Sequence, residues 1–565
     1  MTKTPFLSIA VGLLVFTLSS GRHSAVGADD ATLRPRIDRL VQPYLDNKVI
    51  VGMTIGVLHD GKQEVLGYGR MSRDDRRAPD GDTIYELGSV TKVLTGILLA
   101  DAVVQGRVKL DQPAGQQLPA GVKMPANGDR AITLKDLVTD VSGLPRIPDN
   151  LKLGDPNNPY ADYRAEDLYA FLNNHQLALT PGEKYEYSNL GQGLLGHLLS
   201  LEAKSTYEEL VRKRIAEPLK MSSTTITIDK ASRSRFAPGH TEDGRPAANW
   251  DLPVLAGAGA VRSTANDMLL LAAANLAPPK NKLGEALELA WTIQRKPLQK
   301  GEPPLGLGWL VMRDGTRWHN GQTGGYHSMI LMNRKNKSSV ILLTNTATTE
   351  VDRLAIDISR MLSGAQVAPR KFEKTLEVPA ATLAKFVGRY ELAPGVVFTV
   401  EATDGKLMIG LTGQPSYQVF PRSETVWFYK IVDATITFNV DKNGKCDSLV
   451  LLQNGVKQTA KRTEVPAEAS DKNEKTVDVP AKALAKFVGR YELARGVLFT
   501  VEAVDGKLMI GLTGQPSYQV FPRSETVWFY KVVDATITFN VDKNGKCNSL
   551  VLLQNGVKQR AKRRK

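Results

Sequence analysis

The chain has 565 residues, a formal net charge of +14 and 42% hydrophobic residues, which is ordinary globular composition and enough length for roughly three or four domains. Part of the positive charge lies in the C-terminal KQRAKRRK, which we interpret as solvated surface charge or as a contact with an anionic cell envelope. No nucleic-acid-binding signature accompanies this tail, so we expect no nucleic-acid partner.

Residues 1–28 are predicted to be a secretory signal peptide. Lys3 supplies the positive start, an apolar run follows from Phe6 to Leu18, and small residues precede Ala28. The run is too short for a comfortable transmembrane helix, so we expect no membrane-spanning helix in the mature protein. We therefore expect a periplasmic or secreted protein.

Residues 29–370 combine strand and helix patterns. Strand-like runs stand at both ends, GMTIGVLHDGKQEVLGYG at 52–69 and SSVILLTN at 338–345. Helical patterns lie between them, such as TKVLTGILLADAVVQG and TYEELVRKRIAEPL. This order predicts an α/β (α+β) domain. Its central antiparallel sheet would pair the N-terminal hairpin with strands near residues 309–345, and helices would flank it.

Ser89 and Lys92 stand three residues apart where an apolar helix begins. Residues at this spacing share one face of a helix, so the Lys92 amine can reach the Ser89 hydroxyl. A serine becomes a good nucleophile when a neighbouring base takes its proton. The alternative is a serine that caps the helix, followed by a surface lysine. Since the pattern S-x-x-K also arises by chance, other signals must decide.

A second signal is Tyr187-Ser188-Asn189. A phenol beside a lysine ammonium can lose its proton more easily, so Tyr187 could act as a general base towards Ser89 and later as an acid. Asn189 could hold the lysine or a substrate amide. The alternative is a turn with an aromatic side chain packed at a domain edge.

The third signal is His319-Asn320-Gly321, which opens a glycine-rich strand pattern. Glycine allows a backbone to approach a ligand closely, so this edge could bind substrate and present an N–H to its carbonyl. That N–H and the N–H of Ser89 would form an oxyanion hole. His319 could bind a carboxylate or carry a proton. The alternative is a glycine-rich hairpin with an incidental histidine.

Residues 379–462 and 480–563 are an internal repeat whose two copies differ at about eight positions. Each copy contains β-rich runs joined by Asp-Gly or Asn-Gly, as at Asp404-Gly405, which predicts hairpins and a small antiparallel barrel or sandwich. The polar residues 463–479 between the copies are predicted to be a linker. The only two cysteines, Cys446 and Cys547, are equivalent positions of the copies, so we expect two separate thiols.

The three signals and their flanking sequences resemble the serine β-lactamase and penicillin-binding-protein superfamily, in particular class C β-lactamases and their esterase and peptidase relatives. The matching motifs are YELGSVTKVLTG, YSN and HNGQTGGYHS. Further matches, such as LTPGEKYEYSNLG and AGAGAVRSTANDM, extend the resemblance over nearly all of residues 33–365. The resemblance implies a β-lactamase/transpeptidase-like fold for residues 29–370. The duplicated modules resemble lipocalin-like C-terminal domains of some relatives.

The resemblance also implies roles for individual residues. Ser89 would be the acylated nucleophile, Lys92 and Tyr187 would share the base and acid work, and Asn189 would orient lysine and substrate. The oxyanion hole would consist of the backbone N–H groups of Ser89 and Gln322.

Two departures from the family pattern stand out. His319 occupies the position at which class C β-lactamases have lysine, and histidine there resembles DD-peptidases, D-aminopeptidases and esterases. Asp140 occupies a position at which relatives often have histidine.

The leading hypothesis is an exported, metal-independent serine hydrolase that acts through an acyl-enzyme on β-lactam or peptidoglycan-type amide substrates. An esterase or D-aminopeptidase would use the same residues. A catalytically silent envelope-binding protein is the third hypothesis. The seven histidines form no H-E-x-x-H motif, so neither a metal nor another cofactor is expected. The expected partner is therefore a small-molecule or peptide amide or ester substrate.

Overall fold

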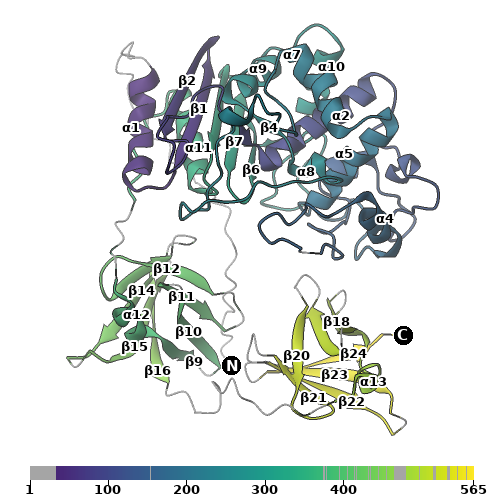
Figure 1. The fold of residues 1–565 in the computed structure, drawn as a ribbon, viewed down its shortest axis with the longest axis vertical. Coiled ribbons are helices and arrows are strands. Elements are labelled where there is room, and N and C mark those ends of the chain that lie inside the picture. The colour runs from purple at the N-terminus through teal and green to yellow at the C-terminus, as the bar shows by residue number, and fades with distance from the viewer. Residues whose placement is uncertain are drawn as a thin grey trace. The chain divides into compact units, whose positions relative to one another are not determined.

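The structure is a computed structural model in which the chain divides after Phe372 into two compact units (Figure 1). The predicted signal peptide and most of the predicted linker lie outside the described residues. The residues that the structure describes are 33–565 except 153, 373–375, 377, 394, 404, 413, 415, 430–431, 433, 443, 454, 464–476, 478, 495–496, 505, 513–516, 531–534, 544, 555–556 and 565.

The first unit is built around a six-stranded sheet in the order β2-β1-β8-β7-β6-β5, with every neighbouring pair antiparallel. The N-terminal hairpin therefore pairs with strands from the end of the domain, as predicted. The strands are β1 (Gly52–His59), β2 (Lys62–Gly69), β5 (Leu310–Val311), β6 (Arg317–Gln322), β7 (His327–Asn333) and β8 (Ser338–Thr344). A separate two-stranded pair consists of β3 (Tyr85–Glu86) and β4 (Arg262–Ser263).

Helices cover both faces of the six-stranded sheet. The longer helices are α1 (Leu33–Asp46), α2 (Thr91–Val104), α4 (Ala165–Asn174), α5 (Asn189–Ala203), α9 (Ala265–Leu276), α10 (Lys282–Trp291) and α11 (Glu350–Leu362). The shorter ones are α3 (Leu134–Val138), α6 (Tyr207–Val211), α7 (Glu217–Leu219) and α8 (Ala256–Gly259). Between α6 and α7 the predicted helix takes a π-helical form at Arg212–Ala216. The predicted α/β class is confirmed.

Side-chain alternation along the strands divides the core into two clusters. In β8, Val340 and Leu342 pack with α1 and α11, whereas Ile341 and Leu343 face the larger cluster around α2. Successive residues of a strand point to opposite faces, so a continuous apolar run such as SSVILLT serves both clusters at once. The sheet is thus buried on both sides.

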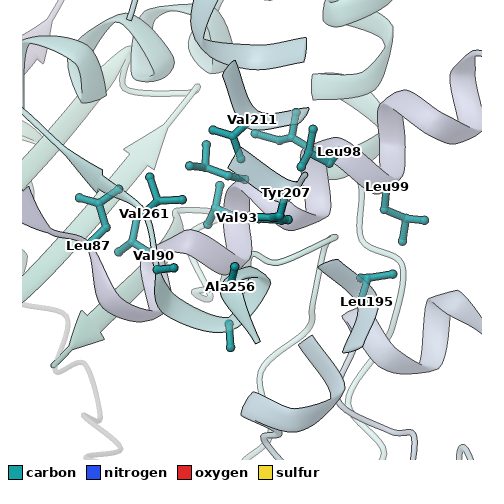
Figure 2. Packing of buried hydrophobic residues seen from close by; sticks show 14 of the residues in the cluster. Leu87, Val90, Val93, Leu98, Leu99, Leu195, Tyr207, Val211, Ala256 and Val261 are labelled. Carbon is teal, nitrogen blue, oxygen red and sulfur yellow. The ribbon is translucent and has the colours of Figure 1, made fainter. Parts of the chain in front are cut away.

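Helix α2 is buried on nearly all of its surface, from Thr91 to Ala102. Its sequence is apolar on every side apart from a few residues, which is typical of a helix in the middle of a domain. Figure 2 shows Val93, Leu98 and Leu99 of this helix among side chains from other elements, including Leu195 of α5. The surrounding packing fixes the start of α2, which contains Lys92 and which Ser89 closely precedes.

The second unit contains two closed eight-stranded antiparallel barrels, β9–β16 and β17–β24. Each begins with a short helix, α12 (Ala380–Phe386) or α13 (Ala481–Leu484). The first barrel has β9 (Gly388–Ala393), β10 (Val396–Thr403), β11 (Lys406–Leu411), β12 (Tyr417–Pro421), β13 (Val426–Tyr429), β14 (Ala434–Val440), β15 (Cys446–Gln453) and β16 (Val456–Thr463). The second has β17 (Gly489–Ala494), β18 (Val497–Val504), β19 (Lys507–Leu512), β20 (Tyr518–Pro522), β21 (Val527–Tyr530), β22 (Ala535–Val541), β23 (Cys547–Gln554) and β24 (Val557–Arg563).

Large side chains fill the interior of each barrel. In the first, Phe386 of α12 stacks on Phe438 with ring centroids 4.3 Å apart, and Tyr390 donates a hydrogen bond to the Cys446 thiol at 3.4 Å. Burial raises the pKa of that thiol, because the thiolate would be desolvated. Cys446 and Cys547 are free and buried, which confirms the prediction of two separate thiols.

Candidate functional site

The site is built around a 3₁₀ turn, Gly88–Val90, that leads directly into α2. Lys92 lies one turn later, and its Nζ is 2.9 Å from the Ser89 Oγ. The spacing read from the sequence therefore brings nucleophile and amine together, as the geometry of a helical turn requires.

The Lys92 ammonium is enclosed by three hydrogen-bond acceptors. Besides Ser89, it donates to the Asn189 Oδ1 and to the carbonyl of Ala258, both at 2.8 Å. Lys92 is only 1% exposed. An ammonium has three donors, so these contacts use all of them and hold the amine in one position.

Burial lowers the pKa of Lys92 to about 7. The main cause is the loss of water around the ammonium; the carboxyl of Asp140 acts in the opposite direction, and Arg146 acts in the same direction as burial. Burial likewise raises the pKa of Asp140 to about 7, partly offset by the N–H of Ser188 and by Lys92. A substantial fraction of Lys92 is thus neutral near pH 7 and able to accept a proton.

Tyr187 lies beside this pair, with Lys92 Nζ 4.8 Å from its ring centroid and its hydroxyl hydrogen-bonded to Ser89. Burial raises the pKa of Tyr187 above its usual value, and the hydrogen bond from Ser89 offsets only part of this effect. This differs from the expectation that the lysine would ease loss of the phenol proton. Near neutral pH Tyr187 therefore keeps its proton, so in the free protein Lys92 rather than Tyr187 is the group able to accept one.

Asn189 is the first residue of α5 and is held by contacts around the helix start. The Ser188 Oγ caps the helix by accepting from the Gly191 N–H at 2.8 Å. The Asn189 N–H donates to the carbonyl of Arg146 at 2.9 Å, and its side chain is hydrogen-bonded to Tyr160. The amide oxygen is therefore aimed at Lys92 by the fold.

The β6 edge faces the nucleophile turn. In the described sheet β5 pairs only with Arg317 and Trp318, and β7 pairs with the other edge of β6. Because Thr323 N–H bonds the Tyr326 carbonyl, ladder alternation directs the N–H of Gln322 away from β7. A Cβ on Gly88 would lie 2.6 Å from the Gln322 nitrogen, so the turn and this N–H are close neighbours.

Glycine is needed on both sides of this contact. Gly88 has a positive φ of 51°, and a Cβ on Gly321 would lie 2.1 Å from the Leu87 carbonyl oxygen and 2.6 Å from the Ser89 nitrogen. The geometry brings the predicted oxyanion-hole residues, Ser89 and Gln322, to one place.

His319 is 4% exposed, and its Nδ1 lies 2.6 Å from the Asn320 carbonyl oxygen. Since a carbonyl only accepts, Nδ1 carries the proton and Nε2 is left as an acceptor. Burial, with a smaller contribution from Lys92, lowers the pKa of His319 to about 3. His319 is therefore neutral near pH 7, which does not support the predicted contact with a carboxylate through a positive charge.

Asn320, predicted to bind substrate, uses its side-chain N–H to donate to Asp352 at 2.7 Å. Its amide nitrogen is thus already committed within the protein. The neighbouring Gly321 contributes only backbone, as the sequence indicated.

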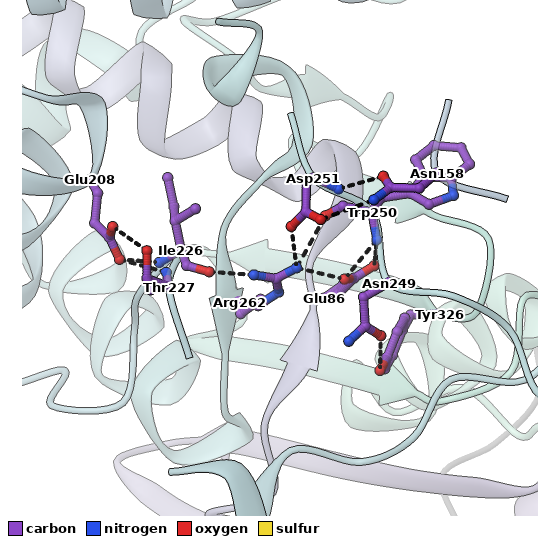
Figure 3. A network of polar contacts seen from close by, with 10 residues as sticks. All are labelled: Glu86, Asn158, Glu208, Ile226, Thr227, Asn249, Trp250, Asp251, Arg262 and Tyr326. Carbon is purple, nitrogen blue, oxygen red and sulfur yellow. Dashed lines mark hydrogen bonds and ion pairs between the residues drawn. The ribbon is translucent and has the colours of Figure 1, made fainter. Parts of the chain in front are cut away.

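A buried ion pair holds the segment just before the nucleophile turn (Figure 3). Arg262 donates to Glu86 at 3.1 Å and also to the carbonyls of Trp250 and Ile226. The Trp250 N–H donates to Glu86 in turn. Both charges lie in the interior, where an ion pair without these extra hydrogen bonds would be costly.

Four residues around the site had no assigned role from sequence: Asp140, Arg146, Tyr160 and Ala258. Asp140 stood out only as a departure from the family pattern, and Ala258 only as part of AGAGAVRSTANDM. Arg146 lies 5.0 Å from the Tyr187 ring centroid, on an exposed segment. Their roles depend on tertiary placement, for which the sequence carries no local signal.

The family described as Beta-lactamase matches residues 37–365. The chain belongs to the β-lactamase family. The resemblance predicted from the three motifs is confirmed. A domain of unknown function, DUF3471, matches residues 373–464 and 473–562, which cover the two barrels.

Curated relatives of this β-lactamase-family protein carry different names. A β-lactamase of Escherichia coli K12 is 31% identical over 281 residues, 49% of this chain and 70% of the relative. The D-alanyl-D-alanine-carboxypeptidase/endopeptidase AmpH of the same organism is 27% identical over 365 residues, 61% of this chain and 91% of the relative. Protein flp of Staphylococcus aureus is 27% identical over 337 residues, 56% of this chain and 64% of the relative.

No described helix has both the length and the apolar character needed to cross a membrane. Within the same residues, His, Cys, Asp and Glu side chains do not gather in groups of three or more that could hold a metal ion.

Proposed function

We propose that this β-lactamase-family protein is an exported serine hydrolase that forms an acyl-enzyme on Ser89. The observation that carries the proposal is the 2.9 Å contact between Lys92 Nζ and Ser89 Oγ. The pKa of Lys92 is lowered to about 7, so the amine can take the serine proton at neutral pH. The motif alone would not require such a neutral, buried amine.

The steps follow from the positions of these groups. Neutral Lys92 accepts the Ser89 proton while Oγ attacks the substrate carbonyl, and the N–H groups of Ser89 and Gln322 stabilise the oxyanion. The tetrahedral intermediate collapses by breaking the bond to the amine or alcohol, which takes a proton from Tyr187 or Lys92. Water then attacks the ester on Ser89, with the same groups acting in reverse order, and releases the acid.

The substrate class is proposed from the relatives, whose names include β-lactamase and D-alanyl-D-alanine-carboxypeptidase/endopeptidase. β-Lactams and peptidoglycan-type amides are therefore the first candidates. The neutral state of His319 favours a second candidate, an esterase or D-aminopeptidase, because no charged side chain at that position would select a substrate carboxylate. Both candidates use the same nucleophile.

The test is labelling with a fluorophosphonate, which reacts with activated serines, followed by intact mass and peptide mapping. We expect one adduct on Ser89 and none in Ser89→Ala, with both proteins equally folded by circular dichroism. A penicillin, a chromogenic cephalosporin, a D-Ala-D-Ala peptide and a nitrophenyl ester then separate the substrate classes. An unlabelled wild-type protein that binds purified cell-wall sacculi would instead indicate a silent envelope-binding protein.

A further inference from the structure

Four side chains, two of them on β6, form a continuous hydrogen-bonded chain beside the nucleophile turn. The Asn320 Nδ2 donates to one carboxylate oxygen of Asp352 at 2.7 Å. The other oxygen lies 2.7 Å from the His327 Nε2, and the His327 Nδ1 lies 3.0 Å from the Gln322 Oε1. This chain of hydrogen bonds therefore starts and ends on the strand segment Asn320–Gln322, and Asp352 and His327 are the two residues that close it.

The two closing residues lie on rigid elements. His327 is the first residue of β7 and is 1% exposed, and Asp352 lies in the first turn of α11. Helix α11 is fixed against the sheet by the buried side chains of Val351, Leu354 and Ile358. The Asp352 side chain, 23% exposed, is thus held at a fixed distance from β6.

We propose that Asp352 and His327 are positioning residues that fix the backbone of Asn320–Gln322 and so aim the Gln322 N–H into the oxyanion hole. The inference rests on the proposed function, because it assigns that N–H to the substrate oxyanion. Neither side chain touches the reacting atoms; both act through the side chains on either side of Gly321.

The physical need for such a clamp comes from the edge position of this segment. In the described sheet β5 leaves the edge from His319 to Gln322 unpaired, and Gly321 has no side chain to pack. A donor moved by about 1 Å from its working position can cost about 100-fold in rate. The two carboxylate oxygens of Asp352 restrain both ends of the segment, one by its bond to Asn320 and the other through His327 to Gln322.

The test compares Asp352→Ala with Asp357→Ala in the full-length protein. Ala removes both bonds of the carboxylate, whereas Asn could keep both, because its amide N–H can donate to the His327 Nε2 when the imidazole proton lies on Nδ1. Asp357 lies on the same helix, is hydrogen-bonded to Arg353 and Arg360 and not to Asn320 or His327, so its substitution reports the general cost of the same change.

We expect Asp352→Ala to lower kcat by about 10- to 100-fold, with KM changed less than about three-fold, because an oxyanion donor acts mainly in the transition state. Affinity for a phenylboronic acid, whose Ser89 adduct is tetrahedral, should fall by a similar factor. Hydrogen–deuterium exchange of peptides covering residues 317–329 should become faster. Asp357→Ala should change none of these.

Equal kinetics and equal exchange in the two variants would overturn the inference. So would a loss confined to thermal stability. Wild-type protein without turnover or boronic-acid binding would count against the proposed function instead. In that case the exchange of residues 317–329 still decides whether Asp352 fixes the strand.

Discussion

Lys92 and Asn189 are 97 residues apart in the chain, yet the Lys92 Nζ donates to the Asn189 Oδ1 at 2.8 Å. This bond joins the start of α2 to the start of α5, the two helix ends that carry the nucleophile segment and the Tyr187 segment. The amide oxygen accepts from either charge state of the amine, so it holds Lys92 in place without fixing its protonation. The amine can therefore change charge during a reaction while staying 2.9 Å from Ser89.

Hydrolysis should rise with pH through about 7 and then level, because the proposed base is neutral Lys92 and burial lowers its pKa to about 7. The Asp140 carboxyl raises the pKa of Lys92, so Asp140→Asn should move the rising limb of kcat/KM to lower pH. The check is a profile from pH 5 to 9 at constant ionic strength. Charges facing this pair from neighbouring segments, Arg146 and Arg295, are unchanged by the substitution.

A rising limb of kcat/KM that begins far above pH 7 would instead point to the phenolate of Tyr187 as the base, because burial raises the pKa of Tyr187. A limb that stays in place in Asp140→Asn would show that Asp140 does not act on the amine.

Substituting Asn189 with Ala should lower kcat/KM by about 100-fold, since Lys92 loses a buried acceptor that orients it. The free energy of unfolding should fall by about 1–3 kcal/mol, which is the cost of leaving a buried donor unpaired. Asn189→Asp keeps an acceptor oxygen but adds a negative charge, so it should move the rising limb to higher pH. Steady-state kinetics and thermal unfolding of both variants give the comparison, and a wild-type profile in Asn189→Asp would contradict it.

Gly88→Ala should abolish most activity, because the new Cβ would lie 2.6 Å from the Gln322 nitrogen and force the nucleophile turn away from β6. Gly61 provides a matched control: it has a positive φ of 80° in the β1–β2 turn, and an added Cβ there meets nothing within 4 Å. Gly61→Ala should cost about 1–2 kcal/mol of backbone strain and leave kcat unchanged. If the two variants lost activity alike, strain rather than the contact would be the cause.

The two carboxylates that bind Arg262 should differ in their contribution to stability. Glu86 is 3% exposed and Asp251 is 60% exposed, both measured on the side chain. Glu86→Gln removes a buried charge from a paired arginine and should cost about 3 kcal/mol, whereas Asp251→Asn should cost less than about 1 kcal/mol. Differential scanning calorimetry measures both, with the barrel transitions as an internal reference. Similar losses in the two variants would mean that the interior position of Glu86 adds nothing.

Local features of the fold were predictable where the sequence encodes them within a few residues. The Ser89–Lys92 contact follows from helical spacing. The hairpin across Gly405 follows from its turn signal, and Thr403 pairs with Lys406 as that signal requires. Closure of the repeat into a barrel was one of two predicted outcomes, because it depends on β9 pairing with β16, about seventy residues later, as in Glu391 with Lys461.

Electrostatic states at the site could not be predicted from the motifs. His319 was expected to bind a carboxylate or to carry a proton, but burial, together with the nearby Lys92, lowers its pKa to about 3 and leaves it neutral. Tyr187 was expected to ionise more easily, yet desolvation raises its pKa and outweighs the hydrogen bond from Ser89. Burial of a side chain is set by segments far away in the sequence, so residue type and spacing leave the sign of such shifts open.

The mutual approach of Gly88 and Gly321 has a consequence for how this protein can vary. Each position lies within 3 Å of backbone atoms on the facing segment once a Cβ is added, so neither accepts another residue while the other segment stays in place. Single-step mutation can therefore alter the side chains that surround the nucleophile, such as Arg146, but not the spacing between the nucleophile turn and its facing strand. Libraries that aim to change substrate preference should randomise the side chains that surround the nucleophile and leave both glycines untouched.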